Sequence, residues 1–376
     1  MYAAVEKILR KGTTLAWAPR SKPPVDLWCD EHRRLSTDGK GSSRGGKWNT
    51  DCTPYLREIL RAMLSPEVRE IAVQKSTQVG ATELLFCYVS YCAAVLKQSL
   101  LYVYPTRDKG QSVNTDRLIP ALQNCEPTAK LLSMAGLKAA TQSKIRLLGV
   151  MIQFAYTKSA DSMRGDPFGK VLNDEIDVFD YSREDPIENG RSRQTTFDDS
   201  LMISVSTPMD DQTGITLMYD TANVRWTFQT PCSKCGDFFE LWEFGLVTWI
   251  GGMKVSGASA GANCWIVCPC CAGRINLDDH TWMMQHGIWI TQTEEIVSDG
   301  TILGTLDQQT RELTQAQIAG AAMLSRIGSD GFRKDDEGNY QEHTRTYGVR
   351  IEGERARLPG LHDAITDLGQ RDTGAC

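Results

Sequence analysis

Short apolar runs alternate with helix-length segments through the first half of the chain. After an apolar run that ends at Val73, the pattern predicts a loop, a helix from Thr82 to about Lys97, and a strand at Ser99–Tyr104. The same pattern predicts a helical stretch through Leu122 and then strands near Ile145–Tyr156, Lys170–Leu172 and Leu201–Val205. Strands that alternate with helices indicate an α/β fold with a mostly parallel sheet. Ligands of such sheets bind beyond the carboxyl ends of the strands.

The first predicted loop resembles a phosphate-binding loop with its lysine displaced. The usual pattern GxxxxGK[ST] places the lysine after the last glycine, but here Ala81 has that position and Lys75 stands where the first glycine would be. The Lys75 ammonium, the turn at Gly80 and the Thr82 hydroxyl can still supply the groups that phosphate and Mg²⁺ require. The helix N-terminus adds a field that favours an anion. A strand, loop and helix with an incidental glycine is the alternative. The candidate nucleotide-binding residues are Lys75, Ser76, Thr77, Gln78, Val79, Gly80, Ala81 and Thr82.

Two further strands end in polar residues that suit the same chemistry. Asp174 and Glu175 follow an apolar strand, as in a Walker B motif, where the first acid holds Mg²⁺ and the second polarises the attacking water. Ser206 and Thr207 end another strand and would lie beside the acids if the two strands are neighbours. Hydroxyls placed there can sense the γ-phosphate. The acids from Asp177 to Asp185 are interpreted as surface residues or neighbours of the site, not as metal ligands.

Two CxxC pairs stand out among the 12 cysteines. Cys232 and Cys235 form one pair, Cys268 and Cys271 form the other, and 32 residues separate them. Four thiolates on two such turns can close a tetrahedral Zn²⁺ site, and paired CxxC motifs are specific for this role. Buried free thiols are the alternative. Possible substitute ligands are Cys264, Cys270, His280 and His286.

Composition and charge narrow the class of protein. The chain has 376 residues, of which 41% are hydrophobic and 23% charged, as in a soluble globular protein with more than one domain. The longest apolar stretches, such as Leu84–Leu96, are too short to span a bilayer, and residues 1–20 lack a signal-peptide core, so a cytosolic setting is expected.

Residues 1–170 carry 25 Lys and Arg against 15 Asp and Glu, whereas residues 171–376 carry 16 against 32. A basic first half indicates contact with a polyanion, although solvated charged faces are an equal alternative.

In their order along the chain, these motifs resemble the large subunit of tailed-phage terminase of the lambda-like type. The resemblance covers about residues 25–290 and also includes Trp48, Thr53–Ile59, Leu101–Thr106, Ser159–Gly165 and Trp289. It implies an ASCE-type, RecA-like P-loop ATPase that pumps double-stranded DNA into a procapsid. By this resemblance Lys75 and the turn from Gly80 to Thr82 bind ATP, Asp174 holds Mg²⁺, Glu175 activates water, and Ser206 and Thr207 couple hydrolysis to DNA movement. Arg164 would contact phosphate or DNA, or lie on the surface. The implied partners are a small terminase subunit, the portal of the procapsid and further copies of the chain, in the host cytoplasm and without a membrane.

The expected organisation has four parts and departs from the family at its end. We expect a basic N-terminal segment at 1–50, a P-loop ATPase domain at 51–225, a Cys₄ zinc-ribbon-like insertion at 226–290, and a C-terminal helix with a polar, partly disordered tail at 291–376. The helix is predicted at Asp307–Arg326. The C-terminal nuclease domain of the family, with its clustered acids, is not evident. A helicase-like nucleic-acid-dependent ATPase and a catalytically dead ATPase fold that serves as a zinc-containing docking module remain alternatives.

Overall fold

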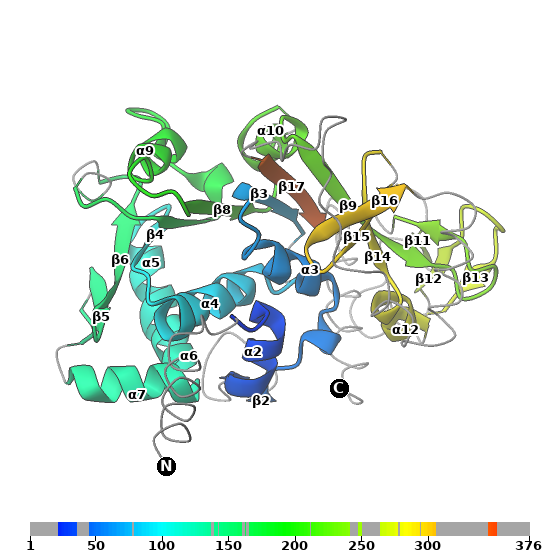
Figure 1. Cartoon of the computed structure of the whole chain (residues 1–376). Coiled ribbons are helices and arrows are strands. Elements are labelled where there is room, and N and C mark those ends of the chain that lie inside the picture. The colour runs from blue at the N-terminus through cyan, green and yellow to red at the C-terminus, as the bar shows by residue number, and fades with distance from the viewer. Residues whose placement is uncertain are drawn as a thin grey trace, which may run out of the picture.

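One large sheet runs through the protein (Figure 1). The computed structural model describes residues 22–35, 45–76, 79–136, 139–141, 143–159, 162, 165–210, 212–240, 247–249, 264–276, 279–293, 295–305 and 345–351. Within these residues the sheet has 12 strands in the order β16-β15-β14-β9-β17-β3-β8-β7-β4-β6-β5, and β10 pairs with β9. The strands from β9 to β6 in this order are parallel, whereas the strands at both edges are antiparallel. The predicted α/β fold with a mostly parallel sheet is confirmed.

The strands of the large sheet are β3 (Val68–Lys75), β4 (Leu100–Tyr104), β5 (Lys144–Leu147), β6 (Val150–Tyr156), β7 (Lys170–Asp174), β8 (Leu201–Ser206), β9 (Val224–Pro231), β10 (Phe238–Phe239), β14 (Ile288–Thr291), β15 (Glu295–Ser298), β16 (Thr301–Thr305) and β17 (Arg345–Ile351). Two small sheets contain β1 (Arg34–Leu35) with β2 (Gly46–Lys47), and β11 (Val247–Trp249) with β12 (Cys264–Val267) and β13 (Arg274–Ile275). The α-helices are α2 (Val25–His32), α3 (Tyr55–Ala62), α4 (Ala81–Tyr91), α5 (Arg107–Val113), α6 (Ile119–Gln123), α7 (Glu126–Ala135), α9 (Pro186–Ser192), α10 (Gly214–Asp220) and α12 (His280–Gln285). Shorter helical turns are η1 (Thr50–Cys52), η2 (Cys92–Leu96), η3 (Asn114–Leu118) and η4 (Ile176–Val178).

Helices cover both faces of the parallel strands, which explains why these strands read as continuous apolar runs. Successive side chains of β3 point to opposite faces: Ile71 and Val73 pack in the main core with Leu84 of α4, whereas Ala72 packs in a second core with Ile215 of α10. In Figure 1, α4, α5 and α6 lie on one side of the sheet, and α9 and α10 lie on the other. None of the helices in the described part of the chain combines the length and apolar character that a membrane crossing needs.

Two predicted elements differ in detail from the structure. The helix predicted from Thr82 to Lys97 ends as an α-helix at Tyr91 and continues as the π-helical turn η2, after which Lys97 adopts a left-handed φ of 57°. The strand region predicted near Ile145–Tyr156 consists of β5 and β6, joined by a turn in which Gly149 has a φ of 84°. A run of apolar residues does not reveal such a reversal unless the glycine is interpreted as a turn.

The strand β17 was not predicted from the sequence. It lies between β3 and β9, parallel to both, near the centre of the sheet (Figure 1). Its residues 345–351 fall in the segment expected to be a polar tail. A seven-residue strand far from its partners in sequence leaves little local signal, because its pairing depends on long-range contacts.

The predicted helix Asp307–Arg326 lies outside the described residues, as does Arg164.

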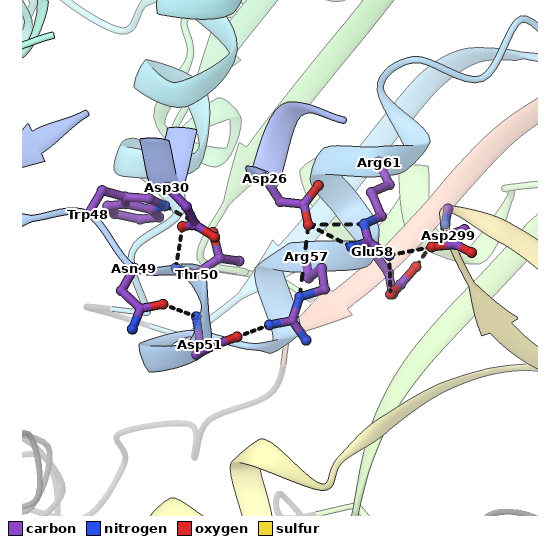
Figure 2. Close-up of polar contacts among 11 residues, drawn as sticks. Asp26, Asp30, Trp48, Asn49, Thr50, Asp51, Arg57, Glu58, Arg61 and Asp299 are labelled. Carbon is purple, nitrogen blue, oxygen red and sulfur yellow. Dashed lines mark hydrogen bonds and ion pairs between the residues drawn. The ribbon is translucent and has the colours of Figure 1, made fainter. Parts of the chain in front are cut away.

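A polar network joins the turn between β15 and β16 to α3 (Figure 2). Arg61 on α3 pairs with the buried Asp26 of α2 at 2.8 Å and with Asp299 in the turn. The backbone N–H of Gly300 donates to Glu58 at 2.7 Å. Gly300 has a φ of 74°, and a Cβ atom there would lie 2.4 Å from the backbone nitrogen of Ala62. The turn therefore requires glycine, and the network attaches the antiparallel edge of the sheet to α3.

We expect the Glu58 carboxyl to make stability depend on pH. Burial raises its pKa from 4.5 to about 7, although Arg61, Arg57 and the Gly300 N–H lower it, while Asp299 raises it further. Between pH 4.5 and about pH 7 the folded state holds a proton on Glu58 that the unfolded state releases. The free energy of unfolding therefore falls as the pH rises from 4.5 to about 7, and this carboxyl causes no further fall above that range. The shift corresponds to at most about 3 kcal/mol. In urea unfolding, the free energy of unfolding should fall less from pH 5 to pH 8 for Glu58→Gln than for wild type. The control is Glu126→Gln, at a glutamate whose side chain is 68% exposed; equal losses in all three proteins would contradict the assignment.

Candidate functional site

The displaced lysine lies at the end of a buried central strand. Lys75 is the last residue of β3, and its side chain is only 7% exposed. Gly80 precedes α4 with a φ of 79°, a left-handed conformation that glycine adopts at little cost. Ala81 is buried at the start of α4, and Thr82 is half-buried beside it. Among the remaining predicted loop residues, Ser76 is half-buried, the Val79 carbonyl accepts from the Tyr55 hydroxyl at 3.2 Å, and Thr77 and Gln78 lie outside the described residues.

Lys75 brings the three predicted motifs together. Its ammonium donates to Glu175 Oε1 at 2.8 Å and to Thr207 Oγ1 at 2.9 Å. The Thr207 N–H lies 3.4 Å from Glu175 Oε2, so one carboxylate contacts both the loop lysine and the end of β8. β8 lies between β3 and β7 in the sheet, which confirms that the Ser-Thr end neighbours the acid pair. Because all three strands are parallel, their carboxyl ends meet at one edge, as the sequence predicts.

The two acids of the predicted Walker B motif occupy different environments. Asp174 ends β7 and is buried, whereas the Glu175 side chain is 32% exposed and its backbone has a left-handed φ of 61°. Burial, and to a lesser extent the neighbouring Glu175 charge, raises the pKa of Asp174 to about 6, although Lys75 and a hydrogen bond from Tyr102 lower it. A cation bound next to a buried carboxyl group favours its charged form.

The oxygen atoms of Asp174 fit a divalent cation. The Tyr102 hydroxyl donates to Oδ2 at 3.2 Å, and within the described residues Oδ1 is buried without a hydrogen-bond partner. Buried polar atoms are normally paired, so an orphaned carboxylate oxygen needs an explanation. Carboxylate and hydroxyl oxygens are ligands that Mg²⁺ accepts. Asp174 is therefore suited to hold Mg²⁺ at this edge of the sheet.

Asp177 organises the loop after β8, a role that sequence reasoning missed. Its carboxylate accepts the backbone N–H groups of Met209 and Ile215, each at 2.8 Å, and its own N–H donates to Ser206 Oγ at 3.1 Å. These contacts tie the loop after β8 and the start of α10 to the segment that follows the acid pair. Asp177 was interpreted as a surface residue or neighbour; its place two residues after the acid pair was the signal available.

The four predicted cysteine ligands lie together. The Sγ atoms of Cys232, Cys235, Cys268 and Cys271 are all within 4.8 Å of one another. The Sγ atoms of Cys232 and Cys271 are 4.0 Å apart, and those of Cys235 and Cys268 are 3.8 Å apart. Zn–S bonds of about 2.3 Å in a tetrahedron place sulfurs about 3.8 Å apart, so the cluster fits the ion.

The two cysteine turns have matching backbone hydrogen bonds. Gly236 N–H donates to Cys232 O at 2.9 Å, and Ala272 N–H donates to Cys268 O at 2.9 Å. Cys270 is exposed and is not a member of the cluster. His280 and His286 are not members of it either, as far as the described residues show, and the side chain of Cys264 lies outside what the structure describes. The arrangement is compatible with a Cys₄ zinc centre.

Comparison with known proteins identifies the family. The profile described as "Phage terminase large subunit gpA, ATPase domain" matches residues 42–289, which is more than half of the chain. The chain belongs to this family. The terminase match includes the displaced lysine, the acid pair, the Ser-Thr end of β8 and all four clustered cysteines. No match was found among curated proteins.

Solved terminase structures also resemble the chain, at low sequence identity. The HK97 bacteriophage large terminase is 12% identical with a TM-score of 0.43, and the match covers 53% of this chain and 40% of that one. The ATPase domain of the Thermus phage P74-26 large terminase is 13% identical with a TM-score of 0.31, covering 40% and 64%. The large terminase of the thermophilic bacteriophage D6E in complex with ADP is 14% identical with a TM-score of 0.32, covering 43% and 41%. The chain thus spans less than two thirds of each of these structures.

Proposed function

We propose that this chain is the ATP-hydrolysing motor subunit of a phage terminase, which packages double-stranded viral DNA into a procapsid. The observation that carries the proposal is the pair of contacts from Lys75 to Glu175 and Thr207. They unite a phosphate-binding cation, a base and a coupling hydroxyl at the edge where parallel α/β sheets bind ligands. Family membership supports the same function.

ATP binding changes the partners of Lys75. The γ-phosphate offers the ammonium more negative charge than the single carboxylate of Glu175, so Lys75 moves from Glu175 and Thr207 to the phosphate oxygens. The loop N–H groups around Gly80 bind the remaining phosphate oxygens. Asp174 and the Thr82 hydroxyl would hold Mg²⁺, which would neutralise phosphate charge. Release of Glu175 leaves its carboxylate available to a water molecule.

Hydrolysis then uses Glu175 as the base. Its carboxylate accepts a proton from water as the water oxygen bonds to the γ-phosphorus. The bond between this phosphorus and the bridging oxygen breaks, and ADP and phosphate leave. Glu175 then passes this proton to solvent, and when the phosphate departs, Lys75 returns to the Glu175 carboxylate and to Thr207. Because Asp177 ties Ser206 and the following loop to the acid pair, this exchange reaches α10, which is how we infer that hydrolysis moves DNA.

The remaining parts of the chain serve this motor. We propose that Cys232, Cys235, Cys268 and Cys271 hold one structural Zn²⁺ that supports the insertion between β9 and β14. Double-stranded DNA, a small terminase subunit, the portal and further copies of the chain are the proposed partners. The excess of Lys and Arg in residues 1–170 supports contact with DNA.

Steady-state ATP hydrolysis with and without double-stranded DNA tests the function. We expect Mg²⁺-dependent activity that DNA stimulates. Lys75→Ala should lose at least about 10-fold in kcat/KM, because it removes a charge-assisted contact to phosphate. The matched control is Lys130→Ala, since that lysine is 70% exposed and pairs with Glu126 on the surface of α7. The kcat/KM of Lys130→Ala should equal that of wild type.

The outcomes separate the candidate functions. Equal activity in wild type and Lys75→Ala would contradict this nucleotide site. Absence of both hydrolysis and nucleotide binding in the wild type would favour the docking module on a dead ATPase fold. Stimulation by single-stranded DNA alone would favour the helicase-like alternative.

A further inference from the structure

A fully buried tyrosine contacts the acid that we propose as the Mg²⁺ ligand. Tyr102 lies on β4 directly opposite Leu172 of β7, and Asp174 is two residues farther along the same face of β7. An aromatic side chain reaches such a diagonal neighbour. The Tyr102 hydroxyl accordingly lies 3.2 Å from Asp174 Oδ2, and the tyrosine has no exposed surface.

The surrounding residues hold the Tyr102 ring in place. The ring stacks on Tyr104, with centroids 4.5 Å apart and planes inclined by 22°. The Tyr104 hydroxyl donates to Asn114 Oδ1 at 2.9 Å, whereas the stacking is made by the rings themselves. α5 approaches so closely that a Cβ atom on Gly110 would lie 2.8 Å from the Tyr104 ring. A tyrosine packed in this way keeps its hydroxyl at one position.

We propose that Tyr102 is a positioning residue for Mg²⁺. Its hydroxyl holds Oδ2 of Asp174 and so directs Oδ1, which has no partner among the described residues, toward the cation. Hydrogen bonds to metal ligands fix their orientation, and their loss typically weakens metal affinity or activity about 10- to 100-fold. The inference rests on the proposed ATPase function, because it assigns a role within that same site. It adds a residue from β4, a strand that carries none of the predicted site residues.

Two hydroxyl deletions in the same stack provide the test. Tyr102→Phe removes the donor to Asp174, whereas Tyr104→Phe removes the neighbouring hydroxyl, which bonds to Asn114. Mn²⁺ binding in the presence of ADP, followed by electron paramagnetic resonance, measures the metal site without turnover. The Mg²⁺ concentration that half-saturates ATP hydrolysis provides the second readout. We expect about 10-fold weaker binding of both ions by Tyr102→Phe, with kcat recovered at high Mg²⁺, and wild-type metal dependence in Tyr104→Phe.

A structural role alone would give a different result. Thermal unfolding reports whether each variant folds, and Tyr102→Met offers a second variant without the hydroxyl. Combined with Asp174→Asn, Tyr102→Phe should cause no further loss of Mn²⁺ binding, since the residue acts through Asp174. Equal metal dependence in the Tyr102 and Tyr104 variants would overturn the inference. A wild type that binds no nucleotide in the presence of Mg²⁺ would instead overturn the proposed function.

Discussion

Glu175→Gln is expected to lower kcat for ATP hydrolysis by about 10²- to 10⁴-fold. Glutamine has nearly the same shape as glutamate but cannot take a proton from water. It also lacks the charge that pairs with Lys75 at 2.8 Å in the structure. Lys75 is then free to bind phosphate, so ATP affinity should be unchanged or higher. Steady-state kinetics combined with equilibrium binding of a fluorescent ATP analogue would measure both effects.

Glu126→Gln is the control for this prediction. Glu126 is 68% exposed on α7 and pairs only with Lys130 among the described residues, so its amide variant should hydrolyse ATP at the wild-type rate. The combination of lost turnover and retained binding is specific to a base. A fall in ATP affinity that accounts for the whole loss of activity would show that Glu175 holds the loop lysine in place and is not the base.

About one zinc ion per chain is expected from elemental analysis, and Cys232→Ser should abolish its binding. The Sγ atom of Cys232 is buried and close to that of Cys271. Serine cannot supply the thiolate, and three remaining ligands form an open site of lower affinity. Since metal binding contributes roughly 10–16 kcal/mol to small zinc modules, we expect the insertion to unfold in the variant or after chelation. Limited proteolysis should then cut between β9 and β14.

The matched control for the zinc prediction is Cys270→Ser. Cys270 is exposed, lies between two of the proposed ligands in sequence, and is outside the four-cysteine cluster. This variant should retain its zinc and its resistance to protease. A wild-type protein without zinc, or equal zinc content in the two serine variants, would exclude the Cys₄ centre.

The candidate site was predictable where its residues follow strands in a motif. The expected positions of Lys75, the acid pair and Ser206–Thr207 depend on a general property of parallel sheets, whose carboxyl ends meet at one edge. The cysteine cluster was predictable because CxxC turns present two thiolates each, whatever the fold around them. Tyr102 and Asp177 were not predictable in this way. Their roles come from contacts with Asp174 and with the loop after β8, and those contacts depend on which strands are neighbours.

The sequence by itself determined the alternation of strands and helices, the order of the motifs and the candidate residues of the site. Local patterns carry this information, because burial on both faces makes the parallel strands apolar and turns require particular residues. Only the tertiary structure decided that β17, from residues 345–351, lies between β3 and β9, and that β8 brings Thr207 to Lys75. Strand order depends on contacts between segments far apart in the chain, where packing outweighs local preference. The same long-range packing pairs Lys75 with Glu175 across 100 residues of sequence.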